Sequence, residues 1–210
     1  MKKLLTERDV DALFKMGSKS INVTKDVLIT SLALDRAKSL GLNIEYGIQY
    51  KKESSTKNTS DAWVFTKVAI GSDHTGFSAK LEVIKYLSSI GVMCTDVGCI
   101  SEESCDYPDF AILVSQKVLR KEVDAGIILD ATGIPSCITS NKFRGIRSAT
   151  CYNEFSALSA RSHNNSNIIC LGAKTLGIET IKSILKVWLS TSFEGGRHQK
   201  RLDKITAIEK

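Results

Sequence analysis

The 210-residue chain contains only two prolines, and none of its apolar runs approaches the roughly 18 residues that a membrane-spanning helix needs. Polar residues surround the short apolar pair near the N-terminus, so we expect no signal peptide and no membrane partner. The hydrophobic share of 42% and the charged share of 25% are ordinary for a globular protein. Membrane and low-complexity classes are therefore excluded, and the length suits one sizeable domain with a small appended unit.

The sequence also lacks the short motifs that mark several common sites. No Cys-x-x-Cys pair supports a zinc or redox centre, and neither a Walker lysine nor a Gly-x-Gly-x-x-Gly loop supports a nucleotide site. The net charge is +6, but the basic residues are scattered without interleaved aromatics, so we expect no nucleic-acid partner. We interpret the cysteines as small buried hydrophobes in a reducing, cytoplasmic compartment. They are Cys94, Cys99, Cys105, Cys137, Cys151 and Cys170.

Residues 1–47 have the pattern of a small α+β module. Thr6 and the acids after it are typical of a helix start, and Val10, Leu13 and Phe14 then share one helical face. The module contains no histidine and no cysteine, so we expect docking or assembly rather than catalysis. Its other expected elements are a strand over 20–23, a helix over 28–40 and an edge strand over 43–46. Residues 48–66, rich in serine, threonine and lysine, are predicted to form a flexible linker.

Residues 67–210 alternate between short apolar runs and longer amphipathic stretches. Such alternation predicts right-handed crossovers and a five-stranded parallel sheet covered on both faces, which is a Rossmann-like three-layer α/β sandwich. The strands are expected over 68–71, 92–97, 127–129, 146–151 and 168–171. The helices are expected over 78–90, 109–119, 134–142, 154–162, 178–189 and 196–208.

The strand over 127–129 runs directly into polar groups. Asp130, Thr132 and Gly133 follow it, and ligands of open α/β sheets bind at this carboxyl edge. Because the segment through Ile134 leads into a helix, its backbone N–H groups could cradle an anion or a developing oxyanion. We therefore take this loop as the candidate chemical centre.

Histidines and arginines supply further candidates. His74 follows the first strand of the sheet, beside Asp73, whereas His163 ends a predicted helix and His198 could merely cap the last one. Arg197 and Arg201 lie four residues apart and share a helix face, which suits bidentate binding of a phosphate. A solvated basic face is the alternative interpretation of that pair.

Together these motifs resemble a known family. Asp73-His74-x-Gly76, Tyr107-Pro108, Thr132-Gly133-Ile134, His163-Asn164 and Gly195-Gly196-Arg197-His198 occur in the order found in type B ribose-5-phosphate isomerases. That family also includes the subunits of galactose-6-phosphate isomerase. The resemblance covers about residues 67 to 208.

The resemblance implies an aldose–ketose isomerase of a phosphorylated sugar, working without metal or cofactor. It also implies a homodimer or tetramer whose active sites use groups from two subunits. The resemblance implies that His163 opens the sugar ring, that Thr132 transfers a hydroxyl proton, and that Gly133 and Ile134 stabilise the enediolate. Substrate contacts are implied for Asn164, Asp73 and Tyr107. Phosphate binding is implied for Arg197, Arg201, His74 and Lys174.

Three positions depart from the family pattern. Asp130 stands where the ribose-type enzymes have the cysteine that moves the proton between C1 and C2, and a carboxylate can serve as that base. Pro135 has no N–H to donate, and Lys174 replaces a frequent arginine. The changes favour a galactose-6-phosphate-type or other hexose or deoxy sugar as an alternative substrate. A catalytically inactive paralogue that binds sugar phosphate or a partner is the second alternative.

The N-terminal module is not part of the usual family. Its Leu4-x-Thr6-Glu7 start and the stretch from Ile29 to Ala37 are similar to N-terminal modules of bacterial microcompartment enzymes. The similarity implies that residues 1–47 dock the chain onto a shell protein or another enzyme of such a compartment.

Overall fold

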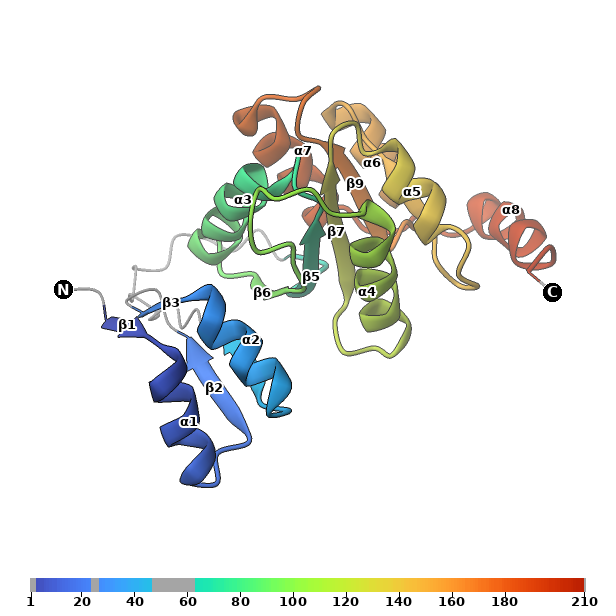
Figure 1. Ribbon diagram of the computed structural model, residues 1–210. Coiled ribbons are helices and arrows are strands. Elements are labelled where there is room, and N and C mark those ends of the chain that lie inside the picture. The colour runs from blue at the N-terminus through green and yellow to red at the C-terminus, as the bar shows by residue number, and fades with distance from the viewer. Residues whose placement is uncertain (1–2, 24–26, 47–62, 210) are drawn as a thin grey trace. The chain divides into compact units, whose positions relative to one another are not determined.

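The chain divides into two compact units, residues 1–56 and 57–210. The structure is a computed structural model that describes residues 3–23, 27–46 and 63–209 (Figure 1). Most of the expected linker lies outside the described residues. Its last part, however, was wrongly assigned, because Trp63 donates from Nε1 to the Ile90 carbonyl at 3.0 Å and the ring of Phe65 lies 5.0 Å from that of Trp188. These aromatic contacts make Trp63 and Phe65 part of the second unit.

The second unit contains the predicted five-stranded parallel sheet, with strand order β6-β5-β7-β9-β8. The strands are β5 (Lys67–Ser72), β6 (Met93–Asp96), β7 (Ala125–Asp130), β8 (Ser148–Thr150) and β9 (Ile168–Gly172). The helices are α3 (Phe77–Ser89), α4 (Tyr107–Leu119), α5 (Ile134–Ser140), α6 (Glu154–Ser162), α7 (Ile178–Ser190) and α8 (Arg197–Thr206). No helix in the described parts of the chain is long and apolar enough to cross a bilayer.

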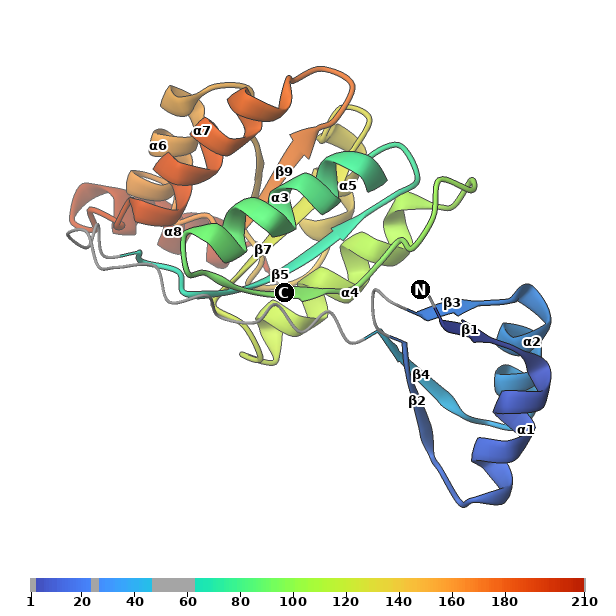
Figure 2. The ribbon, with the colours of Figure 1, turned by 90° about the vertical axis from the view of Figure 1, so that its left-hand side faces the viewer.

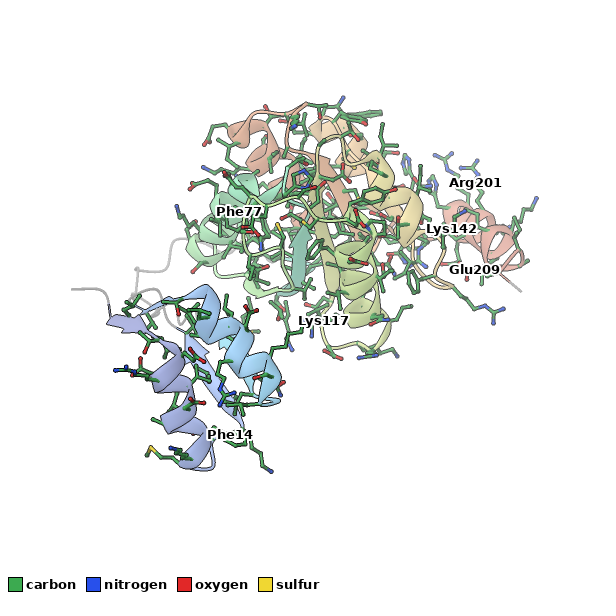
Figure 3. The ribbon with its side chains drawn as sticks, in the orientation of Figure 1. Phe14, Phe77, Lys117, Lys142, Arg201 and Glu209 are labelled. Carbon is green, nitrogen blue, oxygen red and sulfur yellow. The ribbon has the colours of Figure 1, made fainter. Side chains whose placement is uncertain are left out.

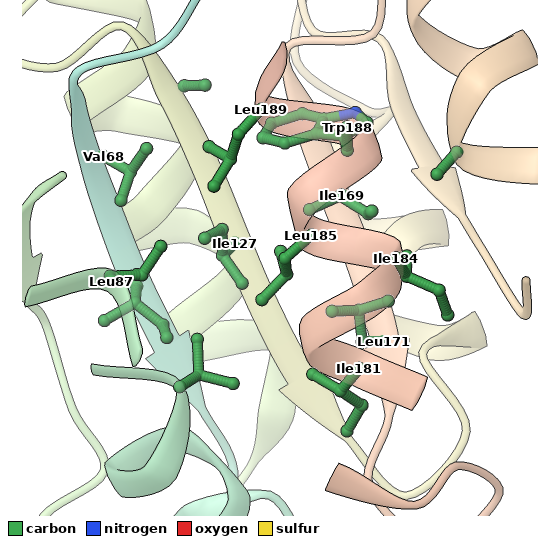
Figure 4. Close-up of a cluster of buried hydrophobic side chains, with 14 of the residues drawn as sticks. Val68, Leu87, Ile127, Ile169, Leu171, Ile181, Ile184, Leu185, Trp188 and Leu189 are labelled. Atoms are coloured by element: carbon green, nitrogen blue, oxygen red, sulfur yellow. The ribbon is translucent and has the colours of Figure 1, made fainter. Parts of the chain in front are cut away.

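Hydrophobic side chains cover both faces of this sheet, which confirms the three-layer sandwich. Side chains from α3, α6 and α7 pack with alternate strand residues such as Ile127 on one face (Figure 4). Side chains from α4 pack with Ile128 and its neighbours on the other face. Figure 2 shows α3 and α7 on the same side of the sheet. The central strand β7 is buried along its whole length, as its continuous apolar run predicts.

The first unit is a tandem repeat of two βαβ segments, which the sequence analysis missed. The first segment comprises β1 (Lys3–Leu5), α1 (Glu7–Lys15) and β2 (Ser20–Val23), and the second comprises β3 (Val27–Ile29), α2 (Ser31–Ser39) and β4 (Asn43–Tyr46). Equivalent strands pair in parallel, β1 with β3 and β2 with β4. Thr6 and Thr30 are the equivalent helix N-caps. The module thus contains helices and strands as expected, but their βαβ order and parallel pairing are those of an α/β unit and not of the expected α+β unit. Docking into a microcompartment stays a prediction.

Two expectations for this unit were wrong in detail. The helix expected over 28–40 begins only after Thr30, whose hydroxyl accepts from the Ala33 N–H at 3.2 Å, so the residues before the cap form β3. In this helix Ala33 faces the core of the unit, whereas Leu32, expected on the apolar face, is 68% exposed. In α1, Val10 is buried, but Phe14 is 46% exposed because it lies at the edge of the apolar face.

Candidate active site

The carboxyl ends of β5 and β7 form the topological switch point of the sheet. The chain leaves β5 toward β6 on one side, while β7 lies on the other side. Ser72 pairs with Leu129, so Asp73 and Asp130 follow neighbouring positions at the end of these two strands. Ligands of open α/β sheets bind in the crevice at such a point. The structure therefore places two predicted site carboxylates at the edge where binding is expected.

Asp73 and Asp130 begin loops of the same sequence pattern and the same hydrogen bonding. The first loop is Asp73-His74-Thr75-Gly76 and the second is Asp130-Ala131-Thr132-Gly133. In each loop, Oδ1 of the aspartate accepts the N–H groups two and three residues later, at 2.9 and 3.0 Å in the first and 2.8 and 2.6 Å in the second. The glycines are required: a Cβ on Gly76 would lie 2.5 Å from the Leu129 carbonyl oxygen, and Gly133 has a φ of 78°.

The anion cradle expected at Thr132, Gly133 and Ile134 is already filled by the chain itself, so this expectation was wrong. Oδ1 of Asp130 accepts the Thr132 and Gly133 N–H groups, and Oγ1 of Thr132 lies 3.2 Å from the Ile134 N–H that it accepts. Oδ2 of Asp130 accepts the Ser136 N–H at 3.1 Å, and Asp130 is only 1% exposed. The buried Asp130 carboxylate thus accepts the backbone N–H groups of its own loop.

Three further predicted residues surround these loops. Nδ1 of His74 lies 3.3 Å from the Cys105 N–H and 3.2 Å from its carbonyl oxygen, which leaves Nε2 for a ligand. Tyr107 begins α4 and is 36% exposed. Lys174 follows β9, and its N–H donates to the Ala131 carbonyl at 3.0 Å, so its exposed side chain adjoins the Asp130 loop.

A second group of predicted residues gathers where α6 ends and α8 begins. The rings of His163 and His198 stack with centroids 4.2 Å apart and an interplanar angle of 3°. Nε2 of His163 and Nε2 of His198 lie 3.9 and 3.5 Å from Oε2 of Glu194. Arg197 donates from Nε to Nε2 of His198 at 3.3 Å, while Arg201 is exposed on the same helix. The arrangement combines an imidazole capable of proton transfer with two guanidinium groups.

The stacked histidines do not suit a metal ion, although their Nε2 atoms and Glu194 Oε2 all lie within 4.8 Å of one another. A metal binds imidazole nitrogen along a lone pair that lies in the ring plane. Two parallel planes cannot contain the same ion, and the Nε2 lone pair of His198 already accepts from Arg197. The trio is therefore better described as a positioned histidine pair.

Two arginines that the sequence analysis did not select hold the turn carrying His163 and Asn164. Arg161, 3% exposed, donates to the Asn165 side chain at 3.0 Å and also to the Ser166 carbonyl. Arg147 donates from Nε to the Asn165 carbonyl at 2.9 Å. Burial, and then the neighbouring Arg147 charge, lower the pKa of Arg161 to about 10. In the sequence, the position of Arg161 two residues before His163 could have indicated this supporting role.

Within a single chain, the described residues of the two site groups are not linked to each other. Among residues 63–209, no hydrogen bond, ion pair or ring contact links the loops of Asp73 and Asp130 to the His163 and Arg197 group. His74 and the two α8 arginines, which the family resemblance assigns to one phosphate, accordingly belong to different groups.

The six cysteines differ in burial and in the pKa of their thiols, whereas the sequence predicted that all are small buried hydrophobes. Cys99, Cys151 and Cys170 are buried, but Cys94, Cys105 and Cys137 are only partly so. A hydrogen bond from the Cys170 thiol, together with those from Thr150 and Ser148, lowers the pKa of Cys137 to about 6 despite the opposing effect of burial. Burial raises the pKa of Cys94 to about 12 and that of Cys151 to about 11.

We expect iodoacetamide at pH 7 to alkylate Cys137 before Cys94 and Cys151. The thiolate is the nucleophile, and a pKa of about 6 leaves Cys137 mostly ionised at that pH. Peptide mass spectrometry over time measures the order, and a rate for Cys137 that rises only above pH 8 would contradict the lowered pKa.

Comparison with known proteins agrees with this geometry. The profile of the Ribose/Galactose Isomerase family matches residues 68–205. Ribose-5-phosphate isomerase B of Escherichia coli strain K12 is 43% identical over 143 residues, which is 68% of this chain and 96% of the relative.

Solved structures give the same result. A ribose 5-phosphate isomerase of Thermotoga maritima is 46% identical, with a TM-score of 0.67 over 68% of this chain and 98% of that one. Ribose-5-phosphate isomerase B of Mycoplasma genitalium, solved with bound ribulose-5-phosphate, is 36% identical, with a TM-score of 0.65 over 68% and 95% of the two chains. The chain therefore belongs to the Ribose/Galactose Isomerase family of sugar-phosphate isomerases, which are intramolecular oxidoreductases.

Proposed function

We propose that the protein interconverts an aldose phosphate and a ketose phosphate through an enediolate, with Asp130 as the base. The observation that supports this role most directly is the place of Asp130 at the end of β7, at the switch point where a ligand meets the sheet. The family cysteine that the residue replaces is the proton-transferring group in the resemblance. A carboxylate can move a proton between adjacent carbons, as the glutamate of triosephosphate isomerase does.

The hydrogen bonds of Asp130 leave room for this chemistry. An ionised carboxylate offers about four lone-pair positions. Backbone N–H groups of Thr132 and Gly133 use Oδ1, and that of Ser136 uses one position on Oδ2. One position on Oδ2 has no partner among the described residues. Since the loop N–H groups are engaged and the Thr132 hydroxyl lies 3.5 Å from Asp130 Oδ1, to which it donates, stabilisation of the enediolate falls to Nε2 of His74.

We expect loss of Arg197 and Arg201 to weaken substrate binding rather than the chemical step. Figure 3 shows Arg201 projecting from α8, and both arginines are exposed. Each charged hydrogen bond to phosphate contributes about 1.5–3 kcal/mol. The double change Arg197→Ala with Arg201→Ala should raise KM by about 100-fold or more while kcat changes less. Steady-state kinetics measure both, and Lys200→Ala on the same helix is the matched control.

We further propose that two copies of the chain complete each active site. The two groups of site residues are not joined within one chain, and the resemblance assigns them to one substrate. A largely apolar cleft of about 940 Å³ lies beside the second group, with Phe155 76% exposed and Ile208 78% exposed in its wall. A second copy would cover these side chains. Light scattering should give a dimer or tetramer, and a monomer that turns over substrate would contradict the proposal.

A second candidate function is sugar-phosphate binding without turnover. It is favoured by one observation: Asp130 itself occupies the N–H groups that a substrate anion would otherwise use. The arginines and His163 would still recognise the phosphorylated sugar.

A panel of substrates separates these functions. Ribose, allulose, galactose and deoxyribose phosphates are supplied to the purified chain, and product is measured by NMR. Turnover of one of them supports the isomerase and names its sugar. Binding by calorimetry with no turnover on any sugar supports the second candidate. Activity that appears only with a homologous second chain would indicate a galactose-6-phosphate-type heteromer.

A further inference from the structure

His198 is the one histidine for which neither the fold nor the proposed chemistry yet gives a use. It lies at the start of α8 and is 5% exposed, which is low for a residue on a helix whose other charged side chains face solvent. A helix cap needs no buried ring. Its ring instead lies flat against His163, with an interplanar angle of 3° and centroids 4.2 Å apart.

The surroundings of His198 fix both its charge and its tautomer. Arg197 donates to Nε2, so Nε2 is an acceptor and the ring proton belongs on Nδ1. Burial first, and then the charges of His163 and Arg197, lower the pKa of His198, while Glu194 acts in the opposite direction. A neutral ring can stack on a second imidazole in either protonation state, whereas two stacked cations would repel each other.

The opposite edge of His163 is held as well. Nδ1 of His163 lies 3.3 Å from Oγ of Ser159, and Nε2 faces Glu194 Oε2 at 3.9 Å. His163 itself has a side chain that is 41% exposed, so its free edge reaches solvent while one face is covered. These contacts act on the edge of the ring, whereas the stack with His198 covers one face and restricts the tilt of the imidazole plane.

We propose that His198 is a positioning residue that acts through His163, holding the imidazole in the orientation needed to move a proton during opening of the sugar ring. The proposal rests on the proposed isomerase function and deepens it. In the step concerned, His163 gives a proton to the ring oxygen as the C1–O bond of the hemiacetal breaks, and the 1-hydroxyl proton passes to water as the aldehyde forms. No electrons are exchanged with an outside reagent. His198 touches neither oxygen and supplies only the orientation.

The kinetic test compares a substrate that must be opened with one that is already open. Ribose 5-phosphate exists mainly as a furanose, but ribulose 5-phosphate cannot close that ring because its 5-hydroxyl carries the phosphate. Removing the ring with His198→Ala should lower the initial rate from ribose 5-phosphate by about 10-fold to 100-fold. The initial rate from ribulose 5-phosphate should stay within about twofold. Equal losses in both directions, or no loss in either, would overturn the proposal.

Two further variants separate the stack from the hydrogen bond. His198→Phe keeps a flat ring but cannot accept from Arg197, and we expect it to retain most of the rate from ribose 5-phosphate. His198→Gln keeps an acceptor without the ring, and it should behave like His198→Ala. The reverse pattern would show that the bond to Arg197, not the stack, is what matters.

NMR without substrate tests the positioning role of His198 separately from the proposed isomerase activity. Imidazole proton and nitrogen NMR of the unliganded protein should show ring-current shifts at His163 that vanish in His198→Ala and persist in His198→Phe. The nitrogen shifts of His198 should indicate a proton on Nδ1. If none of the four sugar phosphates is turned over, the isomerase proposal fails while these spectra still test the stack. His163 signals unchanged in His198→Ala would overturn the positioning role whatever the activity.

Discussion

Replacing Asp130 by asparagine is expected to lower kcat/KM by about 10²–10⁴-fold, the usual loss when a catalytic base is removed. Asparagine keeps an oxygen for the Thr132 and Gly133 N–H groups that Oδ1 now accepts at 2.8 and 2.6 Å. The amide would face the Ser136 N–H in place of Oδ2, at a cost of about 1–3 kcal/mol for the unpaired donor. Stopped-time assays by NMR measure the rate, and circular dichroism checks the fold.

The matched variant Asp130→Cys distinguishes a role of Asp130 as the catalytic base from a role in holding the loop through hydrogen bonds. Cysteine restores the family's base but cannot accept three backbone N–H groups as the carboxylate does. If Asp130 is the base, Asp130→Cys should be clearly more active than Asp130→Asn. If Asp130 only anchors the loop, the cysteine variant should be the weaker of the two, because it loses more hydrogen bonds.

Replacing Trp188 by alanine should lower the free energy of unfolding of the second unit by about 3–5 kcal/mol, as large-to-small changes of buried aromatics do. Trp188 is fully buried in the core between α7 and the sheet, as Figure 4 shows. Its Nε1 donates to Oγ of Ser166 at 2.8 Å, and its ring lies 5.0 Å from that of Phe65. The change leaves a cavity and an unpaired buried hydroxyl together.

Urea unfolding followed by circular dichroism measures this effect. Ile100→Ala is the control, since Ile100 is 64% exposed and its loss should change stability by no more than about 0.5 kcal/mol. A change below about 1 kcal/mol for Trp188→Ala would contradict the description of this core.

Local patterns predicted the sheet well because its strands are short apolar runs bounded by turn residues. β7 and β9 are buried along their length, so hydrophobicity alone identifies them. β1 and β3 were missed because each is only three residues long and directly precedes a helix cap. Their identity depends on pairing with each other, which no local pattern encodes.

The candidate site was likewise predicted only in part. Residue types at strand ends predicted Asp73, His74, Asp130 and Thr132, because the carboxyl edge of a parallel sheet is fixed by topology. The filled cradle was not predicted, although the repeated Asp-x-Thr-Gly pattern at 73–76 and 130–133 was available in the sequence. The partners of His163 could not be found this way, since the stack with His198 joins helices 35 positions apart in the chain.

In the proposed reaction, the Asp130 carboxylate moves a proton between neighbouring sugar carbons. Incorporation of deuterium from D₂O into the sugar phosphate, followed by NMR during turnover, tests it most directly, because a proton held by a carboxylic acid exchanges with solvent before it returns to carbon. We expect deuterium at C1 or C2 with the wild-type chain and none with Asp130→Asn. Incorporation by Asp130→Asn at the wild-type rate would contradict it.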